Sequence, residues 1–250
     1  MHSTLFEIFG IPIRAYGLMM VVGFSLGLWR AVRVAAHRGI DRDRVYDLAL
    51  IALVSGILGA RLVFVLLNLK TETFGGFLAV WNGGLSFHGG VIFAVLAGYI
   101  YTRRVKLSFW SCADLLAPSV AIGYAFTRIG CFLNGCCYGA PTGLPWGVRF
   151  LENGQFTPPS HPTQLYAFAS SLIIFAILTR LEKLNREPGF VFVGYLGLYG
   201  VYRFLIEILR KGYSAEVWML GLTQAQWVSA AMVIAAVIVV FTVYRRPVRK

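Results

Sequence analysis

Charged side chains are scarce in this chain. They make up 14% of its 250 residues, whereas a soluble globular protein carries about 25%. Among the charged residues, the 11 acidic ones are outnumbered by 23 basic ones. Hydrophobic residues make up 58% of the chain. This composition argues against a soluble domain and is typical of a polytopic membrane protein. Because apolar segments run from end to end, we expect one integral membrane domain over residues 1–250.

The sequence also shows neither internal repeats nor the features of a cleavable signal peptide. No internal repeat, low-complexity tract or heptad is visible, which argues against a small membrane transporter built from inverted repeats. The first residues, MHSTLFEIFGIPIR, lack a basic segment followed by a compact apolar run. We therefore expect no cleavable signal peptide, and we expect the first apolar span to stay in the protein.

The net charge of +12 raises the question of a nucleic-acid partner. The basic residues, however, gather mostly within residues 30–44, 103–106, 180–186 and 245–250, after alternate apolar spans. This is the positive-inside pattern of cytoplasmic loops, and it also favours binding to anionic lipid headgroups. We therefore expect membrane lipid rather than nucleic acid as a partner, with the N-terminus outside and the C-terminus in the cytoplasm.

The hydrophobic pattern predicts an all-α protein with seven transmembrane helices. They cover residues 16–36, 46–68, 87–102, 110–127, 164–181, 189–209 and 222–244. Their lengths are close to the roughly 17–25 residues that cross a bilayer, with the third and fourth spans at or below the short limit. The connections on the outer face are long and irregular, above all the loop region 128–163, and such loops often carry function.

That loop region begins with the segment Arg128–Gly139, RIGCFLNGCCYG. A guanidinium beside a hydrophobic span is costly and is usually kept for function. The glycines and Asn134 indicate that the backbone turns there or closely approaches something. We expect this segment to contact a polar ligand at the edge of the membrane.

The cysteines of this segment leave several interpretations open. A metal site would use Cys131, Cys136 and Cys137, but vicinal cysteines rarely bind one tetrahedral metal, so we expect none. A disulfide from Cys131 to one of the other two is possible on an oxidising face. A reactive thiol next to Arg128 is a third possibility, and small packing residues are a fourth. The sequence does not decide among them.

Ionisable residues within the predicted spans are a second group of candidates. Glu207 follows Arg203 by four residues, so the two side chains share a helix face and can pair. Arg61 is open to a structural role as a tie to loop carbonyls. Arg128 and Arg203 both belong to the outer half of the membrane, where two guanidiniums need an anion. Because an arginine fork matches a phosphate, we predict a site for a phospholipid headgroup.

His88 lies between glycine pairs in the segment NGGLSFHGG, residues 82–90. Glycines allow a ligand to approach the backbone closely, and histidine titrates near physiological pH. A structural histidine is almost as well supported, but the pattern favours a catalytic acid or base.

Several further motifs occur in one order along the chain. They are Tyr16-Gly17-Leu18-Met19, Gly59-Ala60-Arg61, NGGLSFHGG, Asp114-Leu115-Leu116-Ala117-Pro118, the Arg128–Gly139 segment, HPTQLY at 161–166, YGVYRFLIEILR at 199–210 and LGLTQAQW at 220–227. Through them nearly the whole chain resembles the prolipoprotein diacylglyceryl transferase family. The family signature reads roughly GRxGNFxNxExxG, and Arg128, Gly130, Asn134 and Gly139 match it. Thr127, Cys131 and Cys136 replace its first glycine, its first asparagine and its glutamate.

The resemblance implies transfer of a diacylglyceryl group from phosphatidylglycerol to the lipobox cysteine of a prolipoprotein, with release of glycerol phosphate. It implies a multi-pass protein of the bacterial cytoplasmic (inner) membrane that binds prolipoprotein signal peptides and needs no cofactor. Catalytic roles fall to His88, Arg128 and Arg203. Binding of the lipid falls to Tyr16, Gly17, Arg61, Asn134, Gly139 and Glu207. Two alternatives to this function are a divergent or inactive paralogue that binds phospholipid and the small membrane transporter considered above.

Overall fold

A computed structural model describes residues 4–8, 11–69, 84–152, 154–184, 186–210 and 217–244. Its helices are α1 (Ala15–His37), α2 (Arg42–Leu67), α3 (Phe87–Arg104), α4 (Phe109–Asn134), α5 (Thr163–Leu181), α6 (Phe190–Glu207) and α7 (Gln224–Thr242), with the 3-10 turn η3 (Glu182–Leu184) after α5. The strands are β1 (Thr4–Ile8), β2 (Ile11–Arg14), β3 (Leu151–Glu152), β4 (Gln155–Phe156), β5 (Val217–Met219) and β6 (Leu222–Thr223). The basic cluster 245–250 and the first two residues of the segment NGGLSFHGG, Asn82 and Gly83, lie outside the described residues.

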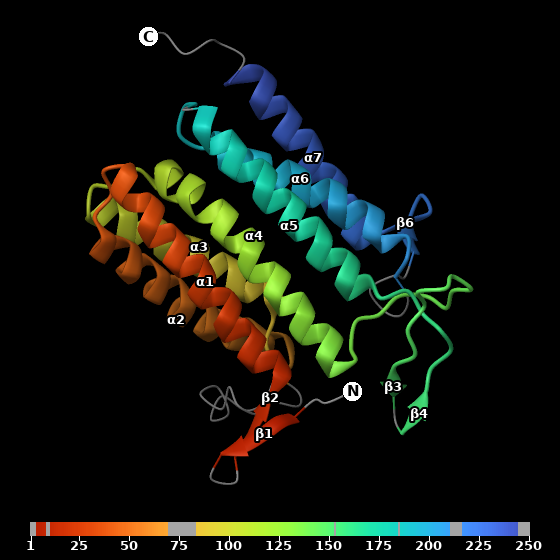
Figure 1. Ribbon diagram of the computed structural model, residues 1–250. Helices are drawn as coiled ribbons and strands as arrows, with labels where there is room; N and C mark the ends of the chain where they lie inside the picture. Colours follow the sequence, from red (N-terminus) through yellow and green to blue (C-terminus); the bar gives the residue numbers. More distant parts are fainter. Residues whose placement is uncertain are drawn as a thin grey trace. The chain divides into compact units, whose positions relative to one another are not determined.

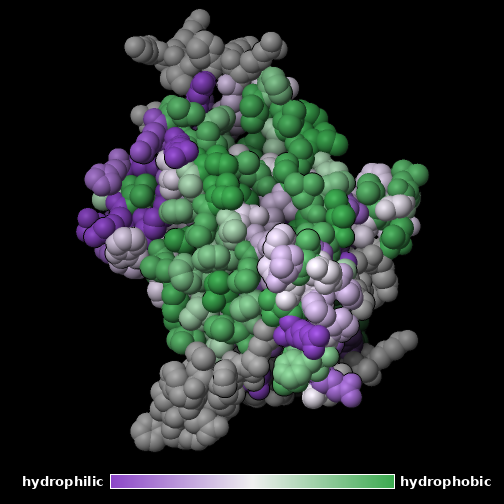
Figure 2. Space-filling model, turned by 45° about the vertical axis from the view of Figure 1, so that its right-hand side comes forward, coloured by the Kyte–Doolittle hydropathy of each residue, from purple (hydrophilic) through white to green (hydrophobic). Residues whose placement is uncertain are grey.

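The predicted helical protein is confirmed, and six of the helices are long and apolar enough to cross a membrane: α1, α2, α4, α5 with η3, α6 and α7. The helix α3 exists where the third span was predicted, but it does not meet these criteria and ends in Arg103 and Arg104. Three antiparallel hairpins, β1–β2, β3–β4 and β5–β6, were not predicted. Figure 2 shows hydrophobic side chains over much of one face, as expected for helices that contact lipid.

The chain divides into two compact units, residues 30–112 and residues 1–29 with 113–250. In the first unit, α2 packs on α3 through small residues. A side chain at Gly89 would place its Cβ 2.6 Å from that of Val63, so only glycine lets the two backbones approach this closely. The absence of a side chain at Gly89 therefore serves helix packing.

In the second unit, α5, α6 and α7 run side by side (Figure 1). A core of small and branched residues joins α4, α5 and α6: Ala117, Ala121, Ile174, Leu178 and Val191. The N-terminus of α6 is capped by an acidic residue of α4. Asp114 accepts hydrogen bonds from the backbone N–H groups of Gly189, at 2.7 Å, and Phe192, at 2.8 Å. A carboxylate at a helix N-terminus satisfies free donors, which explains an acidic residue in a predicted span.

The end of α4 differs from the prediction. The hydrophobic pattern predicts the end of this span at residue 127 and the start of the loop region at 128, but the helix continues through Asn134. Gly130 remains helical because it packs against α1: an added Cβ would lie 3.1 Å from the Cα of Tyr16. The first left-handed residue is Gly135, with φ of 74°, and the chain turns there.

The irregular segment after α4 is ordered by packing. Phe150 is fully buried and stacks on Tyr138 with ring centroids 4.6 Å apart. Ser160 forms bridges with Pro141 and Val148. The segment therefore forms a layer folded onto the ends of the helices rather than a free loop.

Candidate functional site

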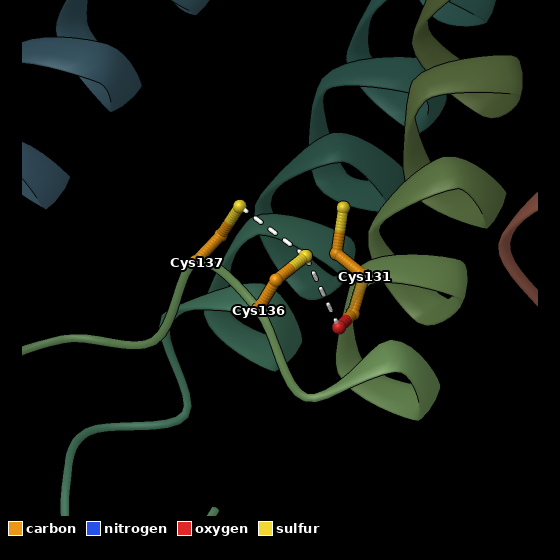
Figure 3. A group of neighbouring side chains, drawn as sticks. All are labelled: Cys131, Cys136 and Cys137. Carbon is orange, nitrogen blue, oxygen red and sulfur yellow. Dashed lines mark hydrogen bonds between the residues drawn. The ribbon is translucent and has the colours of Figure 1, made fainter. Parts of the chain in front are cut away.

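A Schellman motif ends α4 and brings two cysteines together. The N–H of Gly135 donates to the carbonyl of Phe132, and the N–H of Cys136 donates to that of Cys131, both at 3.1 Å. These are the two hydrogen bonds of a Schellman turn, in which the residue after the glycine folds back on the last helical turn. The spacing Cys-Phe-Leu-Asn-Gly-Cys thus places Cys131 next to Cys136 (Figure 3).

Arg128 lies one turn before Cys131 on α4. Its guanidinium carbon is 4.6 Å from the centroid of the Tyr124 ring, a cation–π contact. Its Nε is buried, and no described residue forms a hydrogen bond with it. A buried donor without a partner is costly, so this nitrogen is suited to an anionic ligand. Tyr16 of α1 is within electrostatic reach of both Arg128 and the cysteines.

The predicted pair of Arg203 and Glu207 is confirmed, and it belongs to a larger cluster. The side chain of Glu207 is fully buried and accepts a hydrogen bond from Arg203. Its other oxygen lies 3.3 Å from the hydroxyl of Thr223, which donates to it. Arg210 is the third partner, with its Nε 3.8 Å from Glu207. One carboxylate therefore positions two guanidiniums whose side chains are still about a fifth exposed, at 20% and 19%.

Tyrosines connect the two predicted phosphate-binding arginines. The ring of Tyr124 on α4 meets the rings of Tyr199 and Tyr202 on α6, with centroids 5.8 and 6.4 Å apart. The charges of Arg128 and Arg203 both act on the hydroxyls of these α6 tyrosines. The structure thus gathers two guanidiniums and three phenols in one unit, an arrangement suited to a phosphate.

The thiols next to this group are free. No disulfide involves the four cysteines, all of which the structure describes. Cys136 and Cys137 lie with their sulfurs 3.5 Å apart. Hydrogen bonding with Cys131 and Cys136 lowers the pKa of the Cys137 thiol, and the charges of Arg128 and Arg210 lower it further. The reactive-thiol interpretation therefore has support in the geometry, and so has a shared ligand of all three sulfurs.

The predicted lipid-binding residues of this unit have different environments. Tyr16 and Asn134 are exposed at the facing ends of α1 and α4, where a headgroup can reach them. Gly17 is exposed, and an added Cβ would meet nothing within 4 Å. Gly139 is buried, and its N–H donates to the carbonyl of His161 at 2.9 Å. An added Cβ there would collide with the carbonyl oxygen of Leu209, so Gly139 has a packing reason of its own.

Two predicted residues belong to the unit of residues 30–112. Arg61 is buried and donates to the carbonyl oxygen of Gly84 at 3.2 Å, while its guanidinium lies over the Phe64 ring. The structural tie to a loop carbonyl is thereby confirmed. His88 is exposed near the start of α3, with its ring in edge contact with Phe87.

Sequence reasoning missed four residues that contact the site residues. They are Arg210, Thr223, Tyr124 and Gln164. Three of them carried a local signal: Arg210 is three residues after Glu207, Thr223 begins a capping box with Gln226, and Tyr124 is four residues before Arg128. Gln164 acts between helices, and no pattern within one segment could have indicated it.

The fold and the site together define a multi-pass membrane protein with paired arginines suited to an anion beside a cluster of thiols. Comparison with known families identifies the family of this chain. The family model for prolipoprotein diacylglyceryl transferase matches residues 3–242. The chain belongs to this family.

Curated relatives support the assignment over most of the length. The phosphatidylglycerol–prolipoprotein diacylglyceryl transferase of Clostridium tetani is 33% identical over 228 residues, which cover 90% of this chain and 91% of the relative. The enzyme of the same name from Aeromonas salmonicida is 35% identical, covering 97% and 90%. The one from Geobacter sulfurreducens is 36% identical, covering 83% and 82%.

Proposed function

We propose that this chain transfers the diacylglyceryl group of phosphatidylglycerol to a cysteine thiol of a prolipoprotein. Beyond membership of the family, the proposal is carried by the pairing of Arg128 and Arg203 through the tyrosines of α4 and α6. Their guanidiniums are suited to hold the phosphate of a lipid headgroup at the end of a membrane helix.

The bond changes explain why arginines are needed. A thiolate sulfur forms a bond to the terminal glyceryl carbon, the bond from that carbon to the phosphate oxygen breaks, and its electron pair leaves with glycerol phosphate. Negative charge therefore grows on the phosphate in the transition state. Guanidiniums held in place before the reaction stabilise that charge without reorganisation. Glu207 acts as a positioning residue, because it holds Arg203 in its orientation.

The other predicted residues complete the proposed mechanism. His88 takes the thiol proton directly or through a relay, the role that histidine most often has in general acid–base catalysis. The side chains of Tyr16 and Asn134 form hydrogen bonds to the glycerol headgroup. Gly17, Gly139 and Arg61 shape the lipid site through the backbone and packing that surround them.

The setting of the reaction follows from the arrangement of charges. We infer seven spans in all, with α3 as the additional short one, the N-terminus outside and the C-terminus in the cytoplasm. The site then opens to the outer face of the bacterial cytoplasmic membrane. Phosphatidylglycerol and the signal peptide of the prolipoprotein both reach it laterally from the bilayer.

A reconstituted assay tests the function. The purified chain in phosphatidylglycerol vesicles should convert a synthetic lipobox peptide to a thioether and release one glycerol phosphate per product. A peptide with serine in place of the cysteine is the matched control, because its hydroxyl is a far weaker nucleophile. Well-folded enzyme that produces neither thioether nor glycerol phosphate would contradict the proposal and favour a relative that only binds lipid.

A further inference from the structure

Three thiols meet at the end of α4. Cys131 lies in the last turn of the helix, and Cys136 and Cys137 lie in the turn that follows (Figure 3). Their Sγ atoms all lie within 4.8 Å of one another. Within the described residues, this is the single group of three or more cysteine, histidine or acidic side chains close enough to share a metal ion.

The backbone conformation of Cys137 allows the adjacent residues Cys136 and Cys137 to bind the same metal ion. Adjacent residues in extended chain point to opposite sides, which is why vicinal cysteines rarely bind the same ion. Cys137 instead has a φ of 67°, a left-handed conformation that side chains seldom adopt. The reversal turns its thiol toward that of Cys136, and the two sulfurs lie 3.5 Å apart. Uncommon backbone at a non-glycine residue is typical of functional sites.

The spacing of the sulfurs fits zinc. Tetrahedral Zn²⁺ with zinc–sulfur bonds of about 2.3 Å separates its sulfur ligands by about 3.8 Å. The observed separations, from 3.5 Å up to at most 4.8 Å, bracket this value. Shifts of about 1 Å or less in the side chains therefore suffice to bring the sulfurs around one ion.

The groups behind the cysteines hold them in place. The side-chain amide of Gln164 donates to the carbonyl of Cys136 at 2.6 Å, and the hydroxyl of Thr163 donates to that of Cys137 at 2.8 Å. Both donors come from the first turn of α5, so a second helix fixes the loop. Fixed supports of this kind are what a preorganised metal site requires.

Local charge and access also suit a metal thiolate. Three thiolates and one Zn²⁺ carry one net negative charge. Arg128 lies one turn before Cys131, and the backbone of Arg210 pairs with Gly139, two residues after Cys137. Their guanidiniums can offset the charge. Cys137 is exposed, which leaves a path for an ion and for a further ligand.

We propose that Cys131, Cys136 and Cys137 bind one Zn²⁺ through three thiolates, and that the fourth coordination position takes the thiol of the substrate. This inference rests on the proposed function. Three protein ligands and one open position are the arrangement of catalytic rather than structural zinc sites. Two of the three zinc ligands, Cys131 and Cys136, would thus stand where the family signature has asparagine and glutamate.

The consequence for the reaction is a substrate thiol held as a thiolate. Coordination to zinc deprotonates a thiol, and its proton passes to the base assigned above, His88 or its relay. The bound sulfur then forms its bond to the glyceryl carbon, while the carbon–oxygen bond breaks and glycerol phosphate leaves next to Arg128. The thioether product is neutral and binds zinc more weakly than a thiolate, so it can dissociate and free the position again.

Metal analysis of the purified full-length chain tests the site. We expect about one zinc per chain in the wild type and in Cys112→Ser, which removes the one cysteine outside the cluster. We expect at least about a tenfold loss of zinc in Cys131→Ser and Cys137→Ser. Cys137→His should retain zinc, because imidazole is an alternative ligand. This variant therefore distinguishes loss of a zinc ligand in Cys137→Ser from a failure to fold. A wild type without zinc, with two of the three thiols joined in a disulfide, would overturn the proposal, and so would zinc retained by both serine variants.

Cobalt substitution tests the open position. Co²⁺ in the site should give sulfur-to-metal charge-transfer bands, and a lipobox peptide should increase their intensity by about a third as a fourth sulfur binds. The serine peptide should leave them unchanged. Bands that do not respond to the cysteine peptide at saturating concentration would overturn the proposed role.

Zinc removal separates this inference from the proposed function. Chelation should lower the transfer rate at least about tenfold, and added Zn²⁺ should restore it. Transfer at the full rate in zinc-free enzyme would refute the zinc site as a catalytic element and leave the transferase function intact. Zinc-loaded enzyme without any transfer would instead contradict the proposed function, and the metal content and cobalt spectra would still decide the site.

Discussion

Arg128 lies over the ring of Tyr124, with its guanidinium carbon 4.6 Å from the ring centroid. The contact fixes the plane of the guanidinium on the face of α4 that carries the site, one turn before Cys131. It leaves the buried Nε without a hydrogen-bonding partner among the described residues. An arginine held by its flat face, with a buried Nε donor that no described residue engages, is prepared for a phosphate.

Arg203→Lys should lower the transfer rate by about a hundredfold or more. Lysine keeps the charge but cannot donate two parallel hydrogen bonds to a phosphate, and loss of one transition-state donor costs about this much. Initial rates with the purified variant in phosphatidylglycerol vesicles measure the effect. Arg180→Lys, a change at an exposed arginine of α5, is the control. Equal rates for the two variants would refute the phosphate-binding role of Arg203.

Glu207→Gln should destabilise the protein and reduce transfer together. The amide has the same shape, but it leaves Arg203 and Arg210 without their shared negative partner. We expect a loss of about 3 kcal/mol in the free energy of unfolding, the low end of the range for breaking a buried pair, because both arginines are partly exposed. Equilibrium unfolding in mixed micelles measures it. Unchanged stability would show that Glu207 contributes no net pairing energy.

Gly139→Ala should cost about 1–3 kcal/mol of stability, since the new methyl group would collide with the carbonyl oxygen of Leu209. Gly143→Ala is the matched control in the same segment, because an added Cβ there meets nothing within 4 Å. The difference in unfolding free energy between the two variants measures the close approach. A Gly139→Ala protein that is as stable as Gly143→Ala would contradict the packing described here.

Cys137 should react with iodoacetamide at nearly the same rate at pH 6 and pH 8 in metal-free, reduced protein. Its pKa is lowered, so the thiolate already predominates below neutrality and the rate changes little as the pH rises. An unperturbed thiol with a pKa of about 8.5 would instead react roughly 75-fold faster at pH 8 than at pH 6. Mass spectrometry of the labelled peptide follows the rate. A 75-fold increase at Cys137 would show that the neighbouring thiols and arginines do not stabilise its thiolate.

Much of the helical framework could be predicted because membrane spans are recognised from the hydrophobicity of consecutive residues. The six helices suited to cross a membrane agree in place with predicted spans, and the pair of Arg203 and Glu207 follows from a spacing of four residues. The end of α4 could not be predicted with the same rules. Glycine in RIGCFLNG suggested a turn, yet Gly130 serves contact with α1, and only Gly135 adopts the left-handed conformation.

The sequence by itself determined the class of protein, the positions of most helices and the residues with costly charges in the membrane, because hydrophobicity and helix periodicity act over neighbouring residues. Tertiary structure decided which of those residues act together. Arg128 and Arg203 are connected by tyrosines of two helices, and Gln164 of a third holds Cys136. The left-handed turn at Cys137 then brings three sulfurs to one point. These contacts depend on packing between distant segments, which no local pattern records.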